Sequence, residues 1–208
     1  MSRKNKRGFT LVELIVVLVI LAILASLLVP ALTGHMDKTK KQAVISEARD
    51  VWTAAQAALT ECYALHPESF NDSSNSCRFT ITVNGVTYNN VGRITNGALH
   101  AIQKNPNDKT EAGSSSRRVA AQVLKYLESD GKNPRYTFGS GSLISSATRP
   151  SAYFDGKPKK TDVIIQIFHT QDGRVIAINF AKDGYMATVV PGQETTCEYD
   201  GACIASRG

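Results

Sequence analysis

The hydrophobic pattern of the chain begins with an apolar run near the N-terminus. It extends from Phe9 to Leu32 and contains one charged residue, Glu13. A helix of about 20 apolar residues crosses the ~30 Å hydrocarbon core of a bilayer, so this run is long enough to span a membrane. An ordinary secretory signal has a shorter apolar core followed by small residues at a cleavage site. The pattern therefore predicts a membrane-spanning helix.

The helical pattern continues beyond this run, with one face remaining apolar. The face is formed by residues spaced three or four apart, as one side of a helix requires: Val44, Ala48, Val51, Ala55, Ala58 and Cys62. We therefore expect one helix from about Thr10 to about Leu65, roughly 80 Å long at ~1.5 Å per residue. Pro30 lacks a backbone donor and crowds the preceding turn, so it either kinks this helix or ends it. The amphipathic continuation favours a kink.

The C-terminal part has the alternating pattern of a β-sheet. Residues 162–169, 174–181 and 185–190 are rich in β-branched and aromatic side chains, and Asp-Gly pairs separate them, as in hairpin turns. In the middle run, one set of side chains is expected to face the helix and the other the solvent, as in a half-buried strand. The two sets are Ile176, Ile178 and Phe180, and Val175, Ala177 and Asn179.

The segment between the helix and these strands has weaker signals. Residues 79–90 alternate around Asn84-Gly85, which predicts a hairpin, and residues 117–129 have a helical pattern. Polar residues mark connectors at 67–76, 105–116 and 139–151. The predicted fold class is α+β: a long kinked N-terminal helix packed on a three-stranded antiparallel meander.

The charge of the chain is concentrated at its N-terminus. The formal net charge is +6, and without the four basic residues of the first eight positions only +2 remains. Basic residues directly before an apolar span keep that end of the span in the cytoplasm. Nucleic-acid binding by the rest of the chain is therefore not expected. A second cluster, Lys38, Lys40 and Lys41, is expected on a solvated helix face near lipid headgroups.

The four cysteines, Cys62, Cys77, Cys197 and Cys203, all follow the apolar span. This topology places them outside the cytoplasm, where an even number of cysteines predicts disulfides. Three pairings are possible, and closure of short loops favours Cys62–Cys77 and Cys197–Cys203. A zinc site is the alternative, but the chain has no C-x-x-C pair to support it.

The first thirty residues carry the motif that indicates function. The sequence MSRKNKRG followed by FTLVELIVVLVILAILASLLVP resembles the N-terminus of type IV pilins and pseudopilins. The matching features are the basic leader, Gly8 before an apolar residue, Glu13 as the fifth residue after Gly8, and Pro30. The resemblance covers about the first 35 residues strongly and the rest in layout only.

This resemblance implies a processing and assembly route. A prepilin peptidase would cut between Gly8 and Phe9, and the new amino group of Phe9 would be methylated. An assembly ATPase and an inner-membrane platform would then insert the subunit among identical or related pilins. The implied parts are a cytoplasmic leader (1–8), a membrane or filament-core helix (9–32), its amphipathic continuation (33–65) and an extracellular head (66–208).

Glu13 needs a specific explanation, because a carboxylate in a membrane helix costs roughly 2.5–3.5 kcal/mol at the helix centre. One interpretation is that Glu13 sits at the interface in contact with water. The other is that it pairs with the amino group of Phe9 in a neighbouring subunit. Such a charge-assisted bond would determine the axial register between subunits more than it would add stability.

Other chemistry has little support in the sequence. The chain contains no G-x-S-x-G, H-E-x-x-H or nucleotide-binding loop, so we expect no enzyme activity, cofactor or metal. Glu194, Glu198 and Asp200 only loosely resemble a calcium loop. The sequence therefore predicts a type IV pilus subunit that serves adhesion, motility or other surface interactions, first in the cytoplasmic membrane and then in an extracellular filament. The alternatives are a pseudopilin of a type II secretion or DNA-uptake system, and a membrane-anchored domain that does not polymerise.

Overall fold

A computed structural model describes residues 10–71, 77–83, 85–105, 115–138 and 163–199. Its first element is the helix α1, Leu11–Leu65, which is continuous through Pro30. The prediction of one long helix is therefore confirmed, and Pro30 does not end it; the kink itself stays a prediction. The chain divides into two compact units, residues 1–40 and residues 41–208, and each is described by itself.

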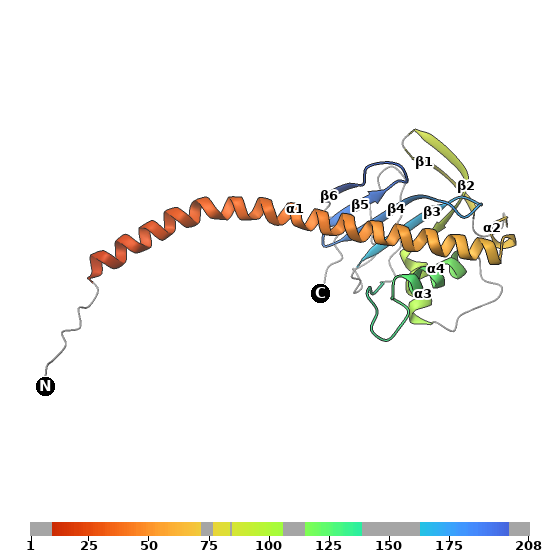
Figure 1. Cartoon of the computed structure of the whole chain (residues 1–208), viewed down its shortest axis with the longest axis horizontal. Helices are drawn as coiled ribbons and strands as arrows, with labels where there is room; N and C mark the ends of the chain where they lie inside the picture. Colours follow the sequence, from red (N-terminus) through yellow and green to blue (C-terminus); the bar gives the residue numbers. More distant parts are fainter. Residues whose placement is uncertain (1–9, 72–76, 84, 106–114, 139–162, 200–208) are drawn as a thin grey trace. The chain divides into compact units, whose positions relative to one another are not determined.

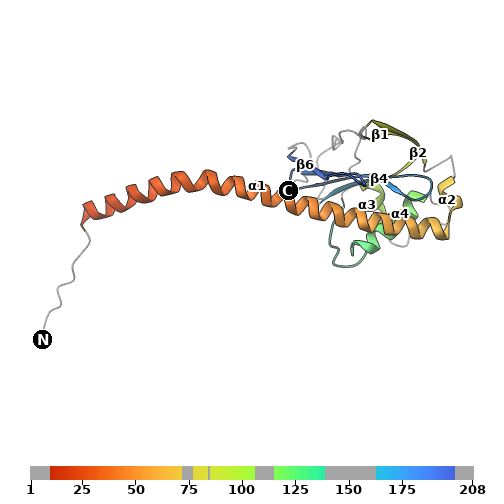
Figure 2. The ribbon, with the colours of Figure 1, turned by 45° about the horizontal axis from the view of Figure 1, so that its top comes forward.

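The second unit contains the end of α1, three further helices and one sheet. The sheet has six antiparallel strands, each paired with its neighbour in sequence, which makes a continuous meander. The helices α1, α3 and α4 cover the same face of the sheet, because their apolar residues share one core cluster with that face (Figures 1 and 2). The elements after α1 are α2 (Glu68–Asn71), β1 (Cys77–Val83), β2 (Val86–Ile94), α3 (Asn96–Lys104), α4 (Ser115–Tyr126), β3 (Ile164–His169), β4 (Val175–Lys182), β5 (Tyr185–Val189) and β6 (Thr196–Tyr199).

The sheet is larger than the sequence predicted. The three expected C-terminal strands and the hairpin around Gly85 are confirmed, but they belong to a single sheet rather than to a separate meander and hairpin. The two parts join where β2 pairs with β3, from Gly92 opposite His169 to Ile94 opposite Ile167. This pairing connects residues more than seventy positions apart, so the local sequence pattern of either strand does not predict it. The four-residue strand β6 extends the other edge.

The strand β4 is buried on both faces, so the expectation of a half-buried strand is wrong. Its alternation is also interrupted, because Phe168 pairs with Ala177 and His169 with Val175, which leaves Ile176 as an extra residue. As a result, Ile176 does not share a face with Ile178. It packs in a second cluster with Ala177, the β1–β2 hairpin and Phe168.

The helix α3 was not predicted, although its start has a recognisable signal. Thr95 is the N-cap, and its side chain accepts a hydrogen bond from the backbone N–H of Ala98. In the first turn, the buried Asn96 accepts a hydrogen bond from the backbone N–H of Ile165 at 3.3 Å. Leu99 and Ile102 then enter the core. A single polar side chain thus fixes α3 to the sheet.

The second half of α1 approaches the β3–β4 turn unusually closely. Gln56 accepts a hydrogen bond from the backbone N–H of Val175 at 2.9 Å and donates one to the carbonyl of Gly173 at 3.0 Å. Gly173 has φ +76°, and a Cβ there would lie 3.0 Å from Cβ of Tyr63 and 3.2 Å from the carbonyl oxygen of Leu59. Only glycine allows both this conformation and this contact.

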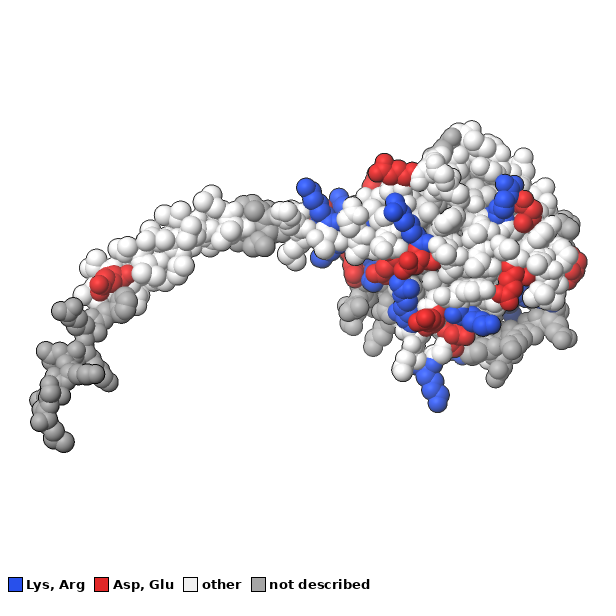
Figure 3. Space-filling model, in the orientation of Figure 1, with Lys and Arg blue, Asp and Glu red and all other residues white. Residues whose placement is uncertain are grey.

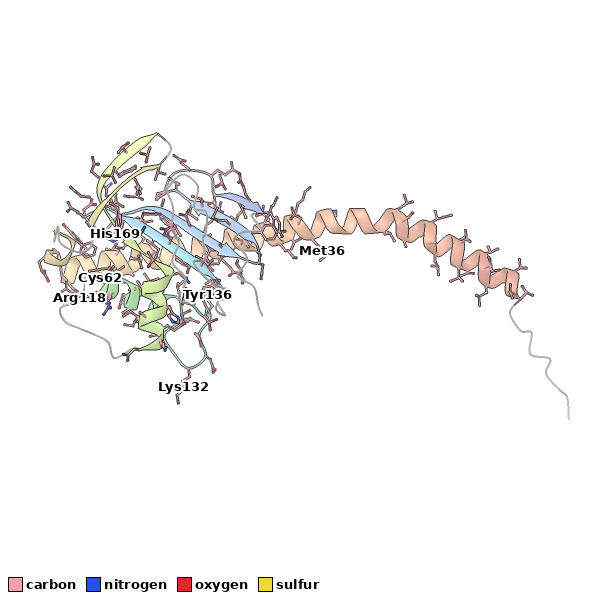
Figure 4. All side chains as sticks on the ribbon, turned by 180° about the vertical axis from the view of Figure 1, so that it is seen from behind. Met36, Cys62, Arg118, Lys132, Tyr136 and His169 are labelled. Carbon is pink, nitrogen blue, oxygen red and sulfur yellow. The ribbon has the colours of Figure 1, made fainter. Side chains whose placement is uncertain are left out.

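An ion pair links α1 to the sheet near the start of the second unit. Glu47 on α1 accepts hydrogen bonds from Nζ of Lys182, at 2.6 and 2.9 Å, and from the hydroxyl of Tyr136, at 2.9 Å. Tyr136 is buried (labelled in Figure 4). Its burial, and to a smaller extent its hydrogen bond to the Glu47 carboxylate, raises the pKa of its hydroxyl. Because the tyrosine hydroxyl stays protonated, it remains a donor to Glu47 across the physiological range.

Histidine 169 lies fully buried at the end of β3. Its Nδ1 is 2.9 Å from the carbonyl oxygen of Thr170, and its ring meets the ring of Phe70 edge-on at 5.6 Å. Nε2 is buried and has no hydrogen-bond partner among the described residues. Burial lowers the pKa of His169 to about 4, so the ring is neutral at pH 7.

The close approach at the β3–β4 turn predicts a difference between two glycines. Gly173→Ala should lower the free energy of unfolding of the full-length chain in detergent micelles by about 2–4 kcal/mol, because backbone strain and steric overlap both contribute. Gly85→Ala is the matched control: its φ is +79° but nothing lies within 4 Å of the added Cβ, so about 1 kcal/mol is expected. Equal losses in denaturant titrations would contradict the close contact.

The burial of His169 predicts acid sensitivity. Between pH 6.5 and 4 the unfolded chain binds a proton that the folded chain excludes, so stability should fall by about 3 kcal/mol as pH drops through this window. The hydrogen bond from the Thr170 hydroxyl lowers the pKa of the nearby Asp172 carboxyl. Urea titrations at several pH values should show a flatter pH dependence for His169→Gln. An equally steep dependence in that variant would exclude His169 as the cause.

Candidate assembly site

The first half of α1 presents apolar side chains in all directions. Every large apolar residue between Leu11 and Leu28 is 49–75% exposed, and Figure 3 shows this segment almost without charged side chains. By length and composition the segment can cross a membrane. Burying a large apolar side chain is worth about 1.5–3 kcal/mol, so leaving this surface in water costs on the order of 10 kcal/mol or more. Lipid or protein must therefore cover it.

The N-terminus of α1 is closed by a reciprocal pair of side chains, Thr10 and Glu13. Oε2 of Glu13 accepts hydrogen bonds from the backbone N–H of Thr10 at 2.9 Å and from its hydroxyl at 2.8 Å. The hydroxyl of Thr10 in turn accepts from the backbone N–H of Glu13 at 3.3 Å. This arrangement is a capping box, and it satisfies backbone donors that would otherwise be unpaired at the helix start. The sequence T-x-x-E is its signature, so the cap is predictable from the sequence.

The capping box leaves part of the Glu13 carboxylate available. Both bonds to Thr10 end on Oε2, and among the residues that the structure describes no donor contacts Oε1 and no cation pairs with Glu13. A carboxylate has about four lone-pair sites, so it can keep the cap and accept another donor. The site is thus a carboxylate fixed to its own helix, at the start of an apolar surface.

The other predicted residues of this region are placed only in part. Gly8 and Phe9 lie outside the described residues, so the cleavage and methylation sites stay predictions. Pro30 lies within α1, between the membrane-length segment and the part of the helix that enters the head.

Two of the four cysteines are buried thiols. Cys62 on α1 and Cys77 at the start of β1 are not joined by a disulfide in this structure. Burial raises the pKa of each thiol to about 11, so almost none of either is thiolate at pH 7. Cys197 lies on β6, and Cys203 lies outside the described residues. Both predicted pairs therefore stay predictions. Within the described ranges no group of three or more His, Cys, Asp or Glu side chains is placed to hold a metal ion.

Comparison with known families finds one match, at the N-terminus. Residues 3–29 match the prokaryotic N-terminal methylation motif. This range contains Gly8, Phe9, the capping box and most of the apolar segment.

Similar proteins match over short segments of the chain. The type II secretion system core protein G of Klebsiella michiganensis is 55% identical over 47 residues, which are 23% of this chain and 33% of that protein. The core protein G of Escherichia coli is 52% identical over 43 residues, 21% of this chain and 30% of that protein. A fimbrial protein of Pseudomonas aeruginosa is 36% identical over 58 residues, 28% of this chain and 38% of that protein.

These matches cover only about a third of the length of each relative. The longest of the three spans 58 residues, so most of the head has no counterpart in it. No solved structure matches the chain. The family model matches only the N-terminal segment, so the head must be interpreted from its own structure.

Proposed function

We propose that this chain, whose N-terminal region belongs to the type IV pilin and pseudopilin family, is a structural subunit of a type IV pilus. The observation that carries the proposal is the fully exposed apolar half of α1 with a capped carboxylate at its start. A filament built from this helix covers the apolar surface with copies of itself. The proposed role is structural rather than enzymatic.

The proposed route begins in the cytoplasmic membrane. The basic leader stays in the cytoplasm and the head lies on the opposite side. A prepilin peptidase cuts between Gly8 and Phe9 and the amino group of Phe9 is methylated; both steps are supported by the match of the methylation motif to residues 3–29. Lipid covers the apolar segment until an assembly ATPase and its membrane platform transfer the subunit into the filament.

The capping box supports a specific role for Glu13 in this transfer. The amino group of Phe9 in a neighbouring subunit carries a positive charge, and Oε1 of Glu13 is the acceptor that Thr10 leaves open. A charge-assisted bond of this kind is strong and directional in an environment of low dielectric constant. Its main contribution is register, since desolvation of the two charges offsets much of the attraction.

A pseudopilus of a secretion system is the second candidate. It is favoured by the higher identity of the matched segments to secretion core proteins G, 55% and 52%, than to the fimbrial protein, 36%. The apolar helix and the cap serve either filament equally well. The pilus and the pseudopilus therefore have to be distinguished by the properties of the head.

Processing predicts a defined mature terminus. Mass spectrometry of the protein purified from filaments should find a chain that begins at Phe9 with a methylated amino group. The precursor from cells without the prepilin peptidase is the control and should begin within the leader. A mature, exported chain that retains Met1 would contradict the proposal.

The role of Glu13 predicts a defect in assembly without a defect in insertion. Glu13→Ala removes the acceptor for the neighbouring amine, so membrane fractions should contain normal amounts of the chain while filament yield falls at least about ten-fold, the effect of losing roughly 1.4 kcal/mol per contact. Thr10→Ala is the matched control: it removes the hydroxyl of the cap and keeps the carboxylate, and we expect a smaller loss. Normal filaments from Glu13→Ala would show that this carboxylate is only interfacial.

The two filament types predict different phenotypes in a deletion strain. If the chain is a pilus subunit, cells without it should lose surface fibres, seen by electron microscopy, and should export their secreted enzymes normally. If the chain is a secretion pseudopilin, cells without it should keep their surface fibres and fail to export their secreted enzymes. Complementation with the wild-type gene should restore whichever property was lost.

A further inference from the structure

Basic residues lie on more than one side of α1 just after its apolar run. Lys38 and Lys40 are exposed, and Lys41 follows directly. We call these three residues the lysine belt. At about 100° per residue, Lys38 and Lys40 point to nearly opposite sides of the helix axis. Figure 3 shows Lys and Arg side chains on α1 beyond its uncharged segment. The positive charge is therefore distributed around the helix instead of forming a patch on one face.

The charge of the lysine belt is not neutralised by its surroundings in the helix. Asp37 is the only acidic residue between Glu13 and Glu47, so three lysines and one aspartate leave a local charge of +2. Lys38 and Lys40 form no hydrogen bond or ion pair with any residue that the structure describes. The described part of the fold therefore gives these two cations no role.

The lysine belt lies close to the lipid headgroups when the apolar run spans a bilayer. Because α1 is continuous, Lys38 lies about 9 Å beyond Leu32, the last residue of the run, at ~1.5 Å per residue. The polar layer on each side of the ~30 Å hydrocarbon core is roughly 5–8 Å thick. Side chains on a helix tilt toward its N-terminus, and long basic side chains extend to the interface. The ammonium groups can therefore reach back into the headgroup layer.

This part of α1 fits a lipid interface better than a protein partner. Met36 is 56% exposed and lies within about one turn of Lys38 and Lys40, so apolar and cationic side chains share one level of the helix. A protein partner would contact one side of the helix, whereas headgroups surround a spanning helix on all sides. Cations on opposite sides of the axis match the second arrangement.

We propose that Lys38 and Lys40 bind the phosphate groups of anionic phospholipids at the outer face of the cytoplasmic membrane. The inference rests on the proposed function, which places the subunit in this membrane before assembly, and it adds a lipid-binding site. A lysine near an anionic membrane surface contributes about a five-fold preference. These contacts fix the depth of the helix in the bilayer, and they are broken when the subunit leaves for a filament.

Retention of lipid in native mass spectrometry tests the site. The full-length chain in detergent micelles is mixed with equal amounts of phosphatidylglycerol and phosphatidylcholine, and the lipids that remain bound are counted. The wild-type chain should retain phosphatidylglycerol preferentially. Lys38→Gln combined with Lys40→Gln should reduce this preference at least about five-fold, because two cations near the headgroup are lost. An unchanged preference in this double variant would overturn the proposal.

The matched control removes two positive charges from the head. Lys125 and Lys132 are both exposed, and Lys132 is labelled in Figure 4. Lys125→Gln combined with Lys132→Gln therefore changes the net charge by the same amount, and its preference for phosphatidylglycerol should match that of the wild type. An equal loss in the control would show that net charge alone attracts the lipid, which would also overturn the site.

Two further measurements test other partners for the lysines. Inorganic phosphate in excess should not displace the bound phosphatidylglycerol, because the acyl chains of the lipid also pack against the apolar run. Displacement would show that the lysines bind any phosphate, and would overturn the assignment to lipid. The filament yield of Lys38→Gln combined with Lys40→Gln should not fall below that of the wild type. A lower yield with unchanged lipid retention would identify another subunit as the partner and would overturn the proposal.

Flotation with vesicles separates this inference from the proposed function. The full-length chain should float with vesicles of phosphatidylcholine, through the apolar run of α1, and also with vesicles of phosphatidylglycerol. If it floats with both but shows no lipid preference in mass spectrometry, only the lysine site is wrong. If it floats with neither, the membrane stage of the proposed function fails and the lysine site fails with it.

Discussion

The structure of the head depends on how closely α1 can approach the sheet. The inner face of the helix consists mainly of small residues, among them Ala48, Ala55 and Ala58, all fully buried. Small side chains let the helix backbone lie near the strands, and the β3–β4 turn comes so near that only a glycine fits at position 173. At that distance Gln56 can reach backbone groups of the turn directly. The close packing thus creates the hydrogen bonds that hold it in place.

The same helix must satisfy a different constraint in its first half. There it has no protein core to enter, and the side chains form an apolar surface on every side. Backbone groups within a helix satisfy each other, and Ser26 donates to the carbonyl of Ile23. Of the described residues in this half, the helix start and the carboxylate of Glu13 then need polar partners. The Thr10–Glu13 cap resolves both with one pair of residues. A helix that is surrounded by lipid or by protein needs its polar groups to form hydrogen bonds within the helix itself.

Local patterns in the sequence predicted the elements better than their assembly. The long helix, the three C-terminal strands and the β1–β2 hairpin follow from apolar spacing and from Asn-Gly and Asp-Gly turns. The joining of β2 to β3 could not be predicted, since it depends on contacts between distant residues such as Gly92 and His169. The alternation in β4 misled because a bulge at Ile176 interrupts it: Val175 joins the core cluster of Ile178 and Phe180, whereas Ile176 does not. In the candidate site, Glu13 was predicted from its cost in a membrane, whereas its partner Thr10 was missed although T-x-x-E marks a cap. In the head, the hydrogen bond between Glu61 and Tyr126 joins α1 to α4, and no spacing within α1 predicts it.

The cap at the start of α1 has a consequence for the speed of growth of any polymer built from this chain. Since Thr10 occupies one oxygen of Glu13 and leaves the other open, a subunit is conformationally finished while still surrounded by lipid. Neither bond at the cap has to break before the open oxygen accepts another donor. Rearrangement of the helix start would then add nothing to the kinetic barrier to elongation.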